Sequence, residues 1–389
     1  QFEKDGKIRH ELSANNTLAA KATELDLSYM GLSELPDFIF RYKNIKSLNL
    51  SQNNMSKLPR QLKKFTQLEH INLSGNNLNL DTIELKSPRL KNLKSLDLSW
   101  NNLTELPGWM RKFRRINSLT LRWNEFKSFP RGIKKLKKLK SINISRNDLT
   151  DFGVHLKHAR KLKSLVSISV EGSNVQQVPD QISFLVHLKR LDLGHNKINY
   201  FSSQIGELDK LEGLSLYNSQ LTKLPEELSF CTDLAGLNLA FNHLKRLPES
   251  FSKLTKLSSL VLNNNELEYL PEDIGDMVNL EEVYIYHNKL TSLPDSFKNL
   301  SQLIHIRFDN TYISEFPSQL FALKNLESID FTNTDISVLP SELVDMESLK
   351  LLAFKEAQID LSDPGNKDYD ALMKRLYDKG VKLYIIDYE

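Results

Sequence analysis

The sequence has one cysteine and no apolar run approaching the roughly 18 residues that a membrane-spanning helix needs. One cysteine excludes disulfide bonds within the chain, and the polar opening QFEKDGKIRH shows no signal peptide. The motifs GxxxxGK[ST], HExxH, CxxC and GxSxG are missing. A net charge of +3 favours no class of partner. We therefore expect a non-enzymatic protein without a cofactor or bound metal.

The chain is built from a repeat of 23 residues. The stretch LSSLVLNNNELEYLPEDIGDMVN, which begins at Leu257, aligns with stretches that begin at Leu234 and Leu280. Their shared frame is LxxLxLxxNxLxxLPxxhxxhxx, where h is apolar. Leu260 and Leu262 are two apart, so they share one face of a short strand. One coil cannot bury its leucines alone, but stacked coils bury them against each other.

This pattern predicts an α/β fold, a right-handed curved solenoid (horseshoe) whose concave side is a parallel sheet of about fifteen strands. We expect an N-terminal cap over residues 1–21, the repeat solenoid over 22–359 and a helix–strand cap over 360–389. Fifteen repeats begin at Ala22, Ile45, Leu68, Leu93, Ile116, Leu139, Leu165, Leu188, Leu211, Leu234, Leu257, Leu280, Leu303, Leu326 and Leu349. The repeats at Leu68 and Leu139 have extra residues, which should lie in the returning segments.

A column of polar residues occupies the ninth position of the frame, which we expect to be buried and hydrogen bonded to the backbone as a ladder. Its asparagines are Asn53, Asn76, Asn101, Asn124, Asn147, Asn196, Asn242, Asn265 and Asn288. Ser173, Ser219, Thr311 and Thr334 replace asparagine in other repeats, and Met30 and Ala357 do so in the terminal ones. Cys231 falls on the buried side, which favours a structural role for it.

This frame resembles the short, LP-containing class of leucine-rich repeat proteins over about residues 22–359. The opening AKATELDLSYMGLSELP is most similar to the first repeat of bacterial members. The coils are longer than those of the enteric effectors of this class, and no ligase domain is appended. The resemblance implies a protein-binding solenoid that is exported from or displayed on a bacterium and engages host proteins.

We interpret the second, third, fifth, seventh and eighth positions as facing outward on the concave sheet. Ser47, Asn49, Ser51 and Asn72 are typical of a solvated face. Two groups differ, and large aromatics and arginine are the residues that anchor protein interfaces. The first group is Trp100, Trp123, Arg122 and Arg146; the second is Tyr217, Phe241, Tyr284, Tyr286, His287 and Arg307. The plainer alternative is that aromatic residues merely suit strands. We treat Trp109 as packing on the convex side.

Charge is uneven along the chain. Residues 111–163 contain 17 Lys/Arg and 3 Asp/Glu, whereas residues 205–295 contain 7 and 15. The basic block lies mostly on returning segments. We favour a solvated face as its interpretation, then a site for an acidic partner, and last a site for nucleic acid. His155 and His158 have a metal-ligand spacing without a third ligand nearby, so a solvated basic helix is favoured over a metal site.

The sequence thus predicts a monomeric protein that binds a partner protein on its concave face, with no nucleic acid and no membrane span. The first alternative is an intracellular signalling scaffold of the Ras-associated type. The second is carbohydrate or glycolipid binding through Trp100 and Trp123, which the neighbouring cations disfavour. The resemblance favours secretion or bacterial surface display over a cytoplasmic location. Asn49, Asn72 and Asn143 lie in glycosylation triplets on the binding sheet, which argues against a eukaryotic secretory pathway and for a bacterial or cytosolic setting.

Overall fold

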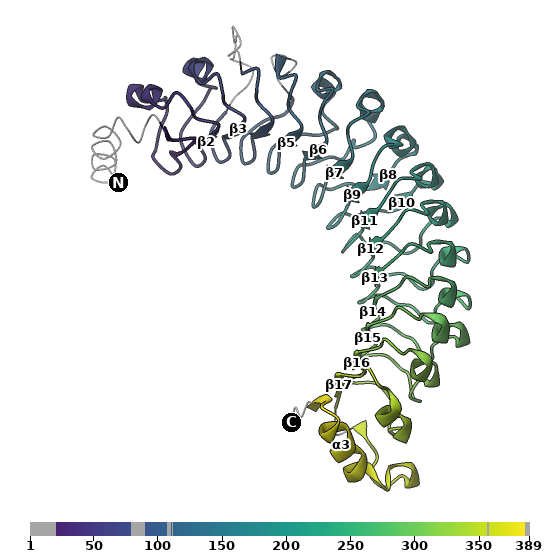
Figure 1. The fold of residues 1–389 in the computed structure, drawn as a ribbon. Helices are drawn as coiled ribbons and strands as arrows, with labels where there is room; N and C mark the ends of the chain where they lie inside the picture. Colours follow the sequence, from purple (N-terminus) through teal and green to yellow (C-terminus); the bar gives the residue numbers. More distant parts are fainter. Residues whose placement is uncertain (1–20, 79–89, 107–109, 111, 356–357, 386–389) are drawn as a thin grey trace. The chain divides into compact units, whose positions relative to one another are not determined.

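The computed structural model describes residues 21–78, 90–106, 110, 112–355 and 358–385. The chain divides into two compact units, Gln1–Val175 and Gln176–Glu389. In each unit, short strands line the concave side and 3-10 turns line the convex side (Figure 1). The expected caps at residues 1–21 and 360–389 remain predictions, and almost all of the first lies outside the described residues.

Seven parallel strands stack in chain order in the first unit. They are β1 (Glu24–Asp26), β2 (Ser47–Asn49), β3 (His70–Asn72), β4 (Ser95–Asp97), β5 (Ser118–Thr120), β6 (Ser141–Asn143) and β7 (Ser167–Ser169). Ile71 pairs with Leu96 and Ile142 with Ile168, which are 25 and 26 residues apart. The insertions therefore leave the register of the strands unchanged. The second insertion forms part of a return that contains the 3-10 helix η6 (Leu156–Lys161).

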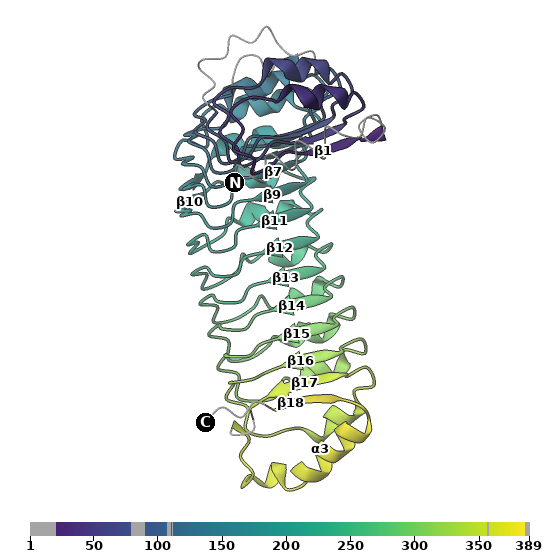
Figure 2. The same cartoon turned by 90° about the vertical axis from the view of Figure 1, so that its left-hand side faces the viewer.

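Nine parallel strands stack in the second unit (Figure 2). They are β9 (Arg190–Asp192), β11 (Gly213–Ser215), β12 (Gly236–Asn238), β13 (Ser259–Val261), β14 (Glu282–Tyr284), β15 (His305–Arg307), β16 (Ser328–Asp330), β17 (Leu351–Phe354) and β18 (Lys382–Ile385). A second small sheet pairs β8 (Gln177–Val178) with β10 (Tyr200–Phe201). Seven and nine strands make sixteen in the described chain, close to the expected fifteen, and the predicted parallel fold is confirmed.

The returning segments that the structure describes contain 3-10 helices rather than α-helices. They are η1 (Asp37–Arg41), η2 (Arg60–Lys64), η5 (Arg131–Lys135), η6, η7 (Asp180–Leu185), η8 (Ser203–Glu207), η9 (Glu226–Phe230), η10 (Phe251–Lys253), η11 (Ile274–Asp276), η12 (Asp295–Asn299), η13 (Ser318–Ala322), η14 (Ser341–Asp345) and η16 (Pro364–Asn366). The proline of the LP pair starts many of them, as Pro294 does for η12. Its φ is fixed near the helical value, and its carbonyl accepts the first bond, from the Phe297 amide at 3.0 Å.

The core lies between the strands and the returns. Leu260 and Leu262 are buried, as the strand period predicts, and Phe251 and Ile274 on the returning segments are buried as well. The ring of Phe331 stacks on that of Phe354 at 5.6 Å, which continues the core toward the last coil. In the described residues, no helix is both long and apolar enough to cross a membrane.

The ninth-position asparagines join neighbouring coils. Asn242 donates to the carbonyls of Leu216 (2.8 Å), Leu239 (2.8 Å) and Ala240 (3.2 Å). Its own carbonyl oxygen accepts from the amides of Ser219 and Leu221, both at 3.0 Å. One side chain thus satisfies backbone groups in two coils where water is excluded.

The last coil is followed by η16, by the helix α3 (Tyr369–Asp378) and by β18, which pairs with β17 (Figure 2). Leu372 and Leu376 are buried, whereas Tyr377 is 74% exposed. Leu372 and Leu376 therefore form the buried side of this helix, and Tyr377 lies outside it. Gly380, with a φ of +88°, follows the helix in the left-handed conformation typical of a C-terminal stop.

Candidate functional site

The eighth position of the frame does not lie on a strand. The strands of the fourteen repeats that begin at Ala22 to Leu326 end at the fifth position. The eighth residue of the described coils has a left-handed backbone, including Trp100 and Trp123 (both φ +54°), Arg146 (+60°), Phe241 (+58°) and His287 (+52°). The seventh position is buried where the residue is small: Ser51, Ser99 and Ser145 are at most 7% exposed, whereas Arg122, Tyr217 and Tyr286 at the same position are half-buried. Our expectation that Ser51 lies on a solvated face is therefore wrong, because the chain has already turned inward there.

The turn after the strand follows from a side-chain bond at the fifth position. The side-chain oxygens of Asp97, Asn143 and Asn238 accept from the amide two residues later, at 2.8, 3.0 and 3.1 Å. This Asx turn ends the strand and directs the eighth side chain outward at the carboxyl edge of the strands. The aromatic residues at the eighth position are therefore displayed by the turn and not by the sheet.

The first predicted group is a contiguous stack in the first unit. The rings of Trp100 and Trp123 lie 4.4 Å apart and nearly parallel, at 17°. The Arg146 guanidinium lies 5.7 Å from the centre of the Trp123 ring. Trp100 is 53% and Trp123 41% exposed. Stacked coils therefore present a rigid aromatic and cationic surface, which we call the Trp cluster.

A carboxylate that the sequence analysis missed completes the Trp cluster. Glu171 pairs with Arg146 at 2.6 Å and lies 3.8 Å from Arg122. It occupies the seventh position of the coil after Arg146, so only the inter-coil register shows the pair. With two arginines and one glutamate, the cluster keeps one net positive charge.

Two glycines at the eighth position border this stack. A Cβ atom at Gly172 would approach the Arg146 guanidinium to 2.8 Å, and one at Gly75 would approach the Gln52 side chain to 2.3 Å. The absence of a side chain at these positions lets Arg146 and Gln52 lie across the neighbouring coil. Trp123 is thus enclosed between Trp100 and Arg146, which leaves little ring face for stacking a sugar.

The second predicted group is two clusters in the second unit. Tyr217 contacts Phe241, with ring centres 5.1 Å apart, and His195, at 4.9 Å. We call these three residues the Tyr217 cluster; the sequence analysis missed His195. The next coil places Val261, Asn263 and Asn264 at the corresponding outward or turn positions, so the aromatic surface is interrupted there.

The other members gather around Arg307. Its guanidinium lies 4.4 Å from the Tyr286 ring centre and pairs with Asp309 (3.1 Å) and Asp330 (3.2 Å). His287 packs edge-on against Tyr286 at 5.7 Å. We call these five residues the Arg307 cluster. Tyr284 pairs with Arg307 across β14 and β15, and its pKa is raised by burial and by Glu282.

Asp309 is the buried member of the Arg307 cluster, at 5% exposure. Burial and the nearby Asp330 carboxylate raise the pKa of Asp309, and Arg307 opposes that rise. The pair of aspartates holds the arginine on the tyrosine ring, where a cation–π contact stabilises its position. The repeat pattern predicts Arg307 as a site residue but neither of the two carboxylates.

The surroundings of His155 and His158 differ from those of a metal site. The two rings stack at 5.3 Å at the start of η6. Burial, together with nearby Arg131, Lys134 and Lys157, lowers the pKa of both histidines. Within the described part of the chain, no group of three potential ligands forms around them or elsewhere. Trp109, which we assigned to packing, lies outside the described residues.

The comparisons with known proteins agree with this geometry. Residues 203–308 match a leucine-rich repeat region, and residues 20–78 and 92–113 match the leucine rich repeat. The chain is a leucine-rich repeat protein, as the frame of the repeat predicts. No curated relative matches the chain in sequence.

Solved structures place it near bacterial members of the class. A leucine-rich repeat protein of Leptospira interrogans is 26% identical, with a TM-score of 0.81 over 96% of this chain and 97% of that one. An internalin of Listeria monocytogenes is 18% identical, with a TM-score of 0.65 over 85% and 95%. A chain of the glycosylated Drosophila Toll–Spatzle complex is 21% identical, with a TM-score of 0.73 over 90% and 49%.

Proposed function

We propose that this protein is a non-enzymatic recognition module that binds a partner protein along the concave side of its coils. The leucine-rich repeat fold is commonly a protein–protein interaction module, and several similar solved chains are described as complexes with protein or peptide ligands. The Trp, Tyr217 and Arg307 clusters would supply the anchors. By similarity to the Leptospira protein, we propose an exported or surface-displayed bacterial protein.

One observation carries the proposal: large aromatic side chains occupy left-handed backbone positions. A left-handed residue other than glycine or asparagine costs roughly 1–2 kcal/mol. Asn218, Asn264, Asn310 and Asn333 occupy the same position in other coils, so asparagine fits the fold there. The plainer interpretation, that aromatics suit strands, fails for Trp100, Trp123 and Phe241 because they are not in strands. A large side chain at a strained and exposed backbone position supports the proposal that these residues contact a ligand.

The Trp cluster has the properties expected of an interface anchor. Stacked tryptophans lose little conformational freedom on binding, because Trp100, Trp123 and Arg146 already restrain each other. Their exposed edges supply apolar area beside an arginine, which is the composition of binding hot spots. The Trp cluster should prefer a surface with acidic groups next to an apolar patch, since it keeps one positive charge.

The proposal is tested by replacing the anchor residues with asparagine, the residue that other coils have at the eighth position. A partner captured by the intact chain is purified and titrated against the wild type, Trp100→Asn/Trp123→Asn, and Phe241→Asn/His287→Asn. Tyr269→Asn, at an exposed residue outside the three clusters, is the matched control. We expect at least one double variant to weaken binding by about 2 kcal/mol or more. Equal affinity for all forms would show that the clusters are not the binding surface.

A further inference from the structure

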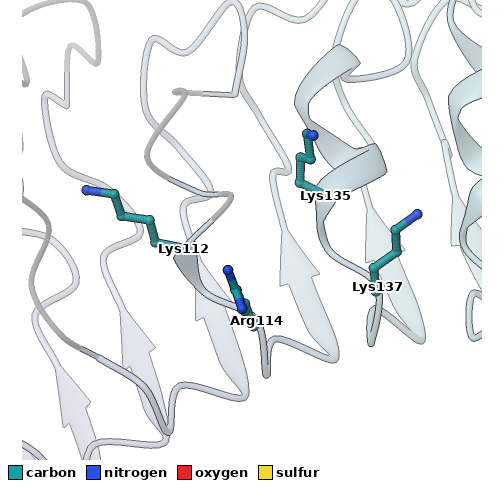
Figure 3. A pocket seen from close by; sticks show the side chains of 4 residues that line it. All are labelled: Lys112, Arg114, Lys135 and Lys137. Atoms are coloured by element: carbon teal, nitrogen blue, oxygen red, sulfur yellow. The ribbon is translucent and has the colours of Figure 1, made fainter.

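The first unit contains a hollow lined by cations, away from the aromatic clusters. Lys112, Arg114, Lys135 and Lys137 line a space of about 680 Å³ (Figure 3). The first two residues precede β5, and the other two precede β6. The hollow therefore lies on the side where the returns run into the amino ends of the strands, opposite the edge that carries the Trp cluster.

The four cations belong to two columns that follow the repeat. Lys112 and Lys135 lie four residues before the next repeat begins, and Arg114 and Lys137 lie two residues before it. The next coil continues both columns with Lys161 and Lys163, which are exposed. Three consecutive coils thus carry a cation at all six positions. The Lys137 ammonium donates to the Lys161 carbonyl at 3.3 Å, which holds it beside the third coil.

A solvated face does not explain this order. In the second unit the same two columns hold two lysines, Lys253 and Lys324, against five acids: Glu207, Asp209, Asp276, Asp345 and Glu347. Among the described residues, no carboxylate forms an ion pair with any of the four cations that line the hollow. Like charges held together without counter-charges destabilise the unit, so their regular spacing indicates a ligand that neutralises them.

We infer that this hollow and its two columns bind a linear sulfated polysaccharide. The ligand must be extended and carry anions at intervals, because the cations repeat from coil to coil. Lysine is a compact point charge that does not require a bidentate acceptor, which suits sulfate groups on a flexible chain. None of the described lining residues is aromatic, so the site lacks the stacking platforms of nucleic-acid binders. A hollow also fits a chain better than it fits a flat membrane.

This site is independent of the proposed concave binding surface. The test measures heparin affinity at physiological ionic strength for the wild type, Lys135→Gln/Lys137→Gln and Lys253→Gln/Lys324→Gln. The two double variants lose equal charge from the same columns, so they separate the hollow from net charge. Thermal melting checks folding, and the first variant should melt at the same temperature as the wild type or higher, because repulsion is relieved.

We expect heparin affinity to fall about 5- to 30-fold in Lys135→Gln/Lys137→Gln and to change less than twofold in the control. Affinity should also fall as salt rises. Trp100→Asn/Trp123→Asn should bind heparin normally, whatever becomes of the protein partner. Equal losses in both double variants, or no heparin binding by the wild type, would overturn the proposal. So would equal or tighter binding of a DNA duplex, of fully desulfated heparin or of phosphatidylserine vesicles through the same lysines.

Discussion

Replacing Asn242 by alanine would remove five hydrogen bonds, three to the neighbouring coil and two within its own coil. Asn242 is 4% exposed and lies between the coils that begin at Leu211 and Leu234. The substitution deletes an amide and leaves the aliphatic packing nearly unchanged. Its effect on stability therefore measures what the polar ladder contributes.

The magnitude follows from which backbone groups keep a partner. The Leu239 carbonyl still accepts from Asn265 (2.9 Å) and the Ala240 carbonyl from the Asn218 amide (2.8 Å). The amides of Ser219 and Leu221 and the carbonyl of Leu216 each lose their bond to Asn242. Each buried unpaired group costs about 1–3 kcal/mol, and a water in the vacated space would satisfy part of the set. We expect a loss of about 3 kcal/mol.

Two further variants at related positions calibrate this value. Asn242→Ser keeps a hydroxyl that can donate to Leu216, as Ser219 donates to the Leu193 carbonyl at 3.0 Å, so the loss should fall to about 1–2 kcal/mol. Asn238→Ala removes one bond, to the Ala240 amide, from a half-buried residue that water can reach. That loss should be about 0.5 kcal/mol, which lies within the usual range for surface changes.

Urea denaturation followed by circular dichroism measures the three free energies of unfolding, and an unchanged slope shows that the same structure unfolds in each variant. The expected order of loss is Asn242→Ala, then Asn242→Ser, then Asn238→Ala. Equal losses for the two alanine variants would refute the assignment of the ninth position as the structural ladder. A loss below about 1 kcal/mol for Asn242→Ala would show that water replaces the side chain fully.

Three other predictions concern single residues. Burial raises the pKa of Cys231 to about 12, so the folded protein should not react with a thiol reagent at pH 8, whereas unfolded protein should; rapid labelling of folded protein would contradict this. The pKa of Asp309 is raised in the folded protein, so the folded state binds this proton more tightly than the unfolded state does. The stability of the wild type relative to Asp309→Asn should therefore fall as the pH rises above about 4. Melting temperatures of the two proteins that change in parallel with pH would contradict this. Trp123→Asn should change stability by less than about 1 kcal/mol, because relief of the left-handed backbone offsets lost stacking, and a larger loss in a urea melt would assign Trp123 to the core.

The sequence by itself determined the repeat, the inward leucines and the parallel strands. A strand period of two places Leu260 and Leu262 on one face, and the spacing of 23 residues puts equivalent residues in adjacent coils. Even the longer repeats at Leu68 and Leu139 keep their strand register. In the repeat at Leu139 the return takes up the extra residues, whereas those of the repeat at Leu68 fall largely outside the described residues. These features depend only on the local geometry of one coil and on its regular repetition along one axis. Both can be read from the repeat in the sequence.

Only the tertiary structure decided what surrounds the exposed residues. The frame could not show that the strand ends at the fifth position, so Ser51 was assigned to the wrong side and Trp100 to the wrong element. Glu171 and Asp330 meet their arginines through the stacking of coils, about 23–25 residues apart in sequence. Such contacts depend on how side chains from neighbouring coils share space, which the pattern within one coil does not contain.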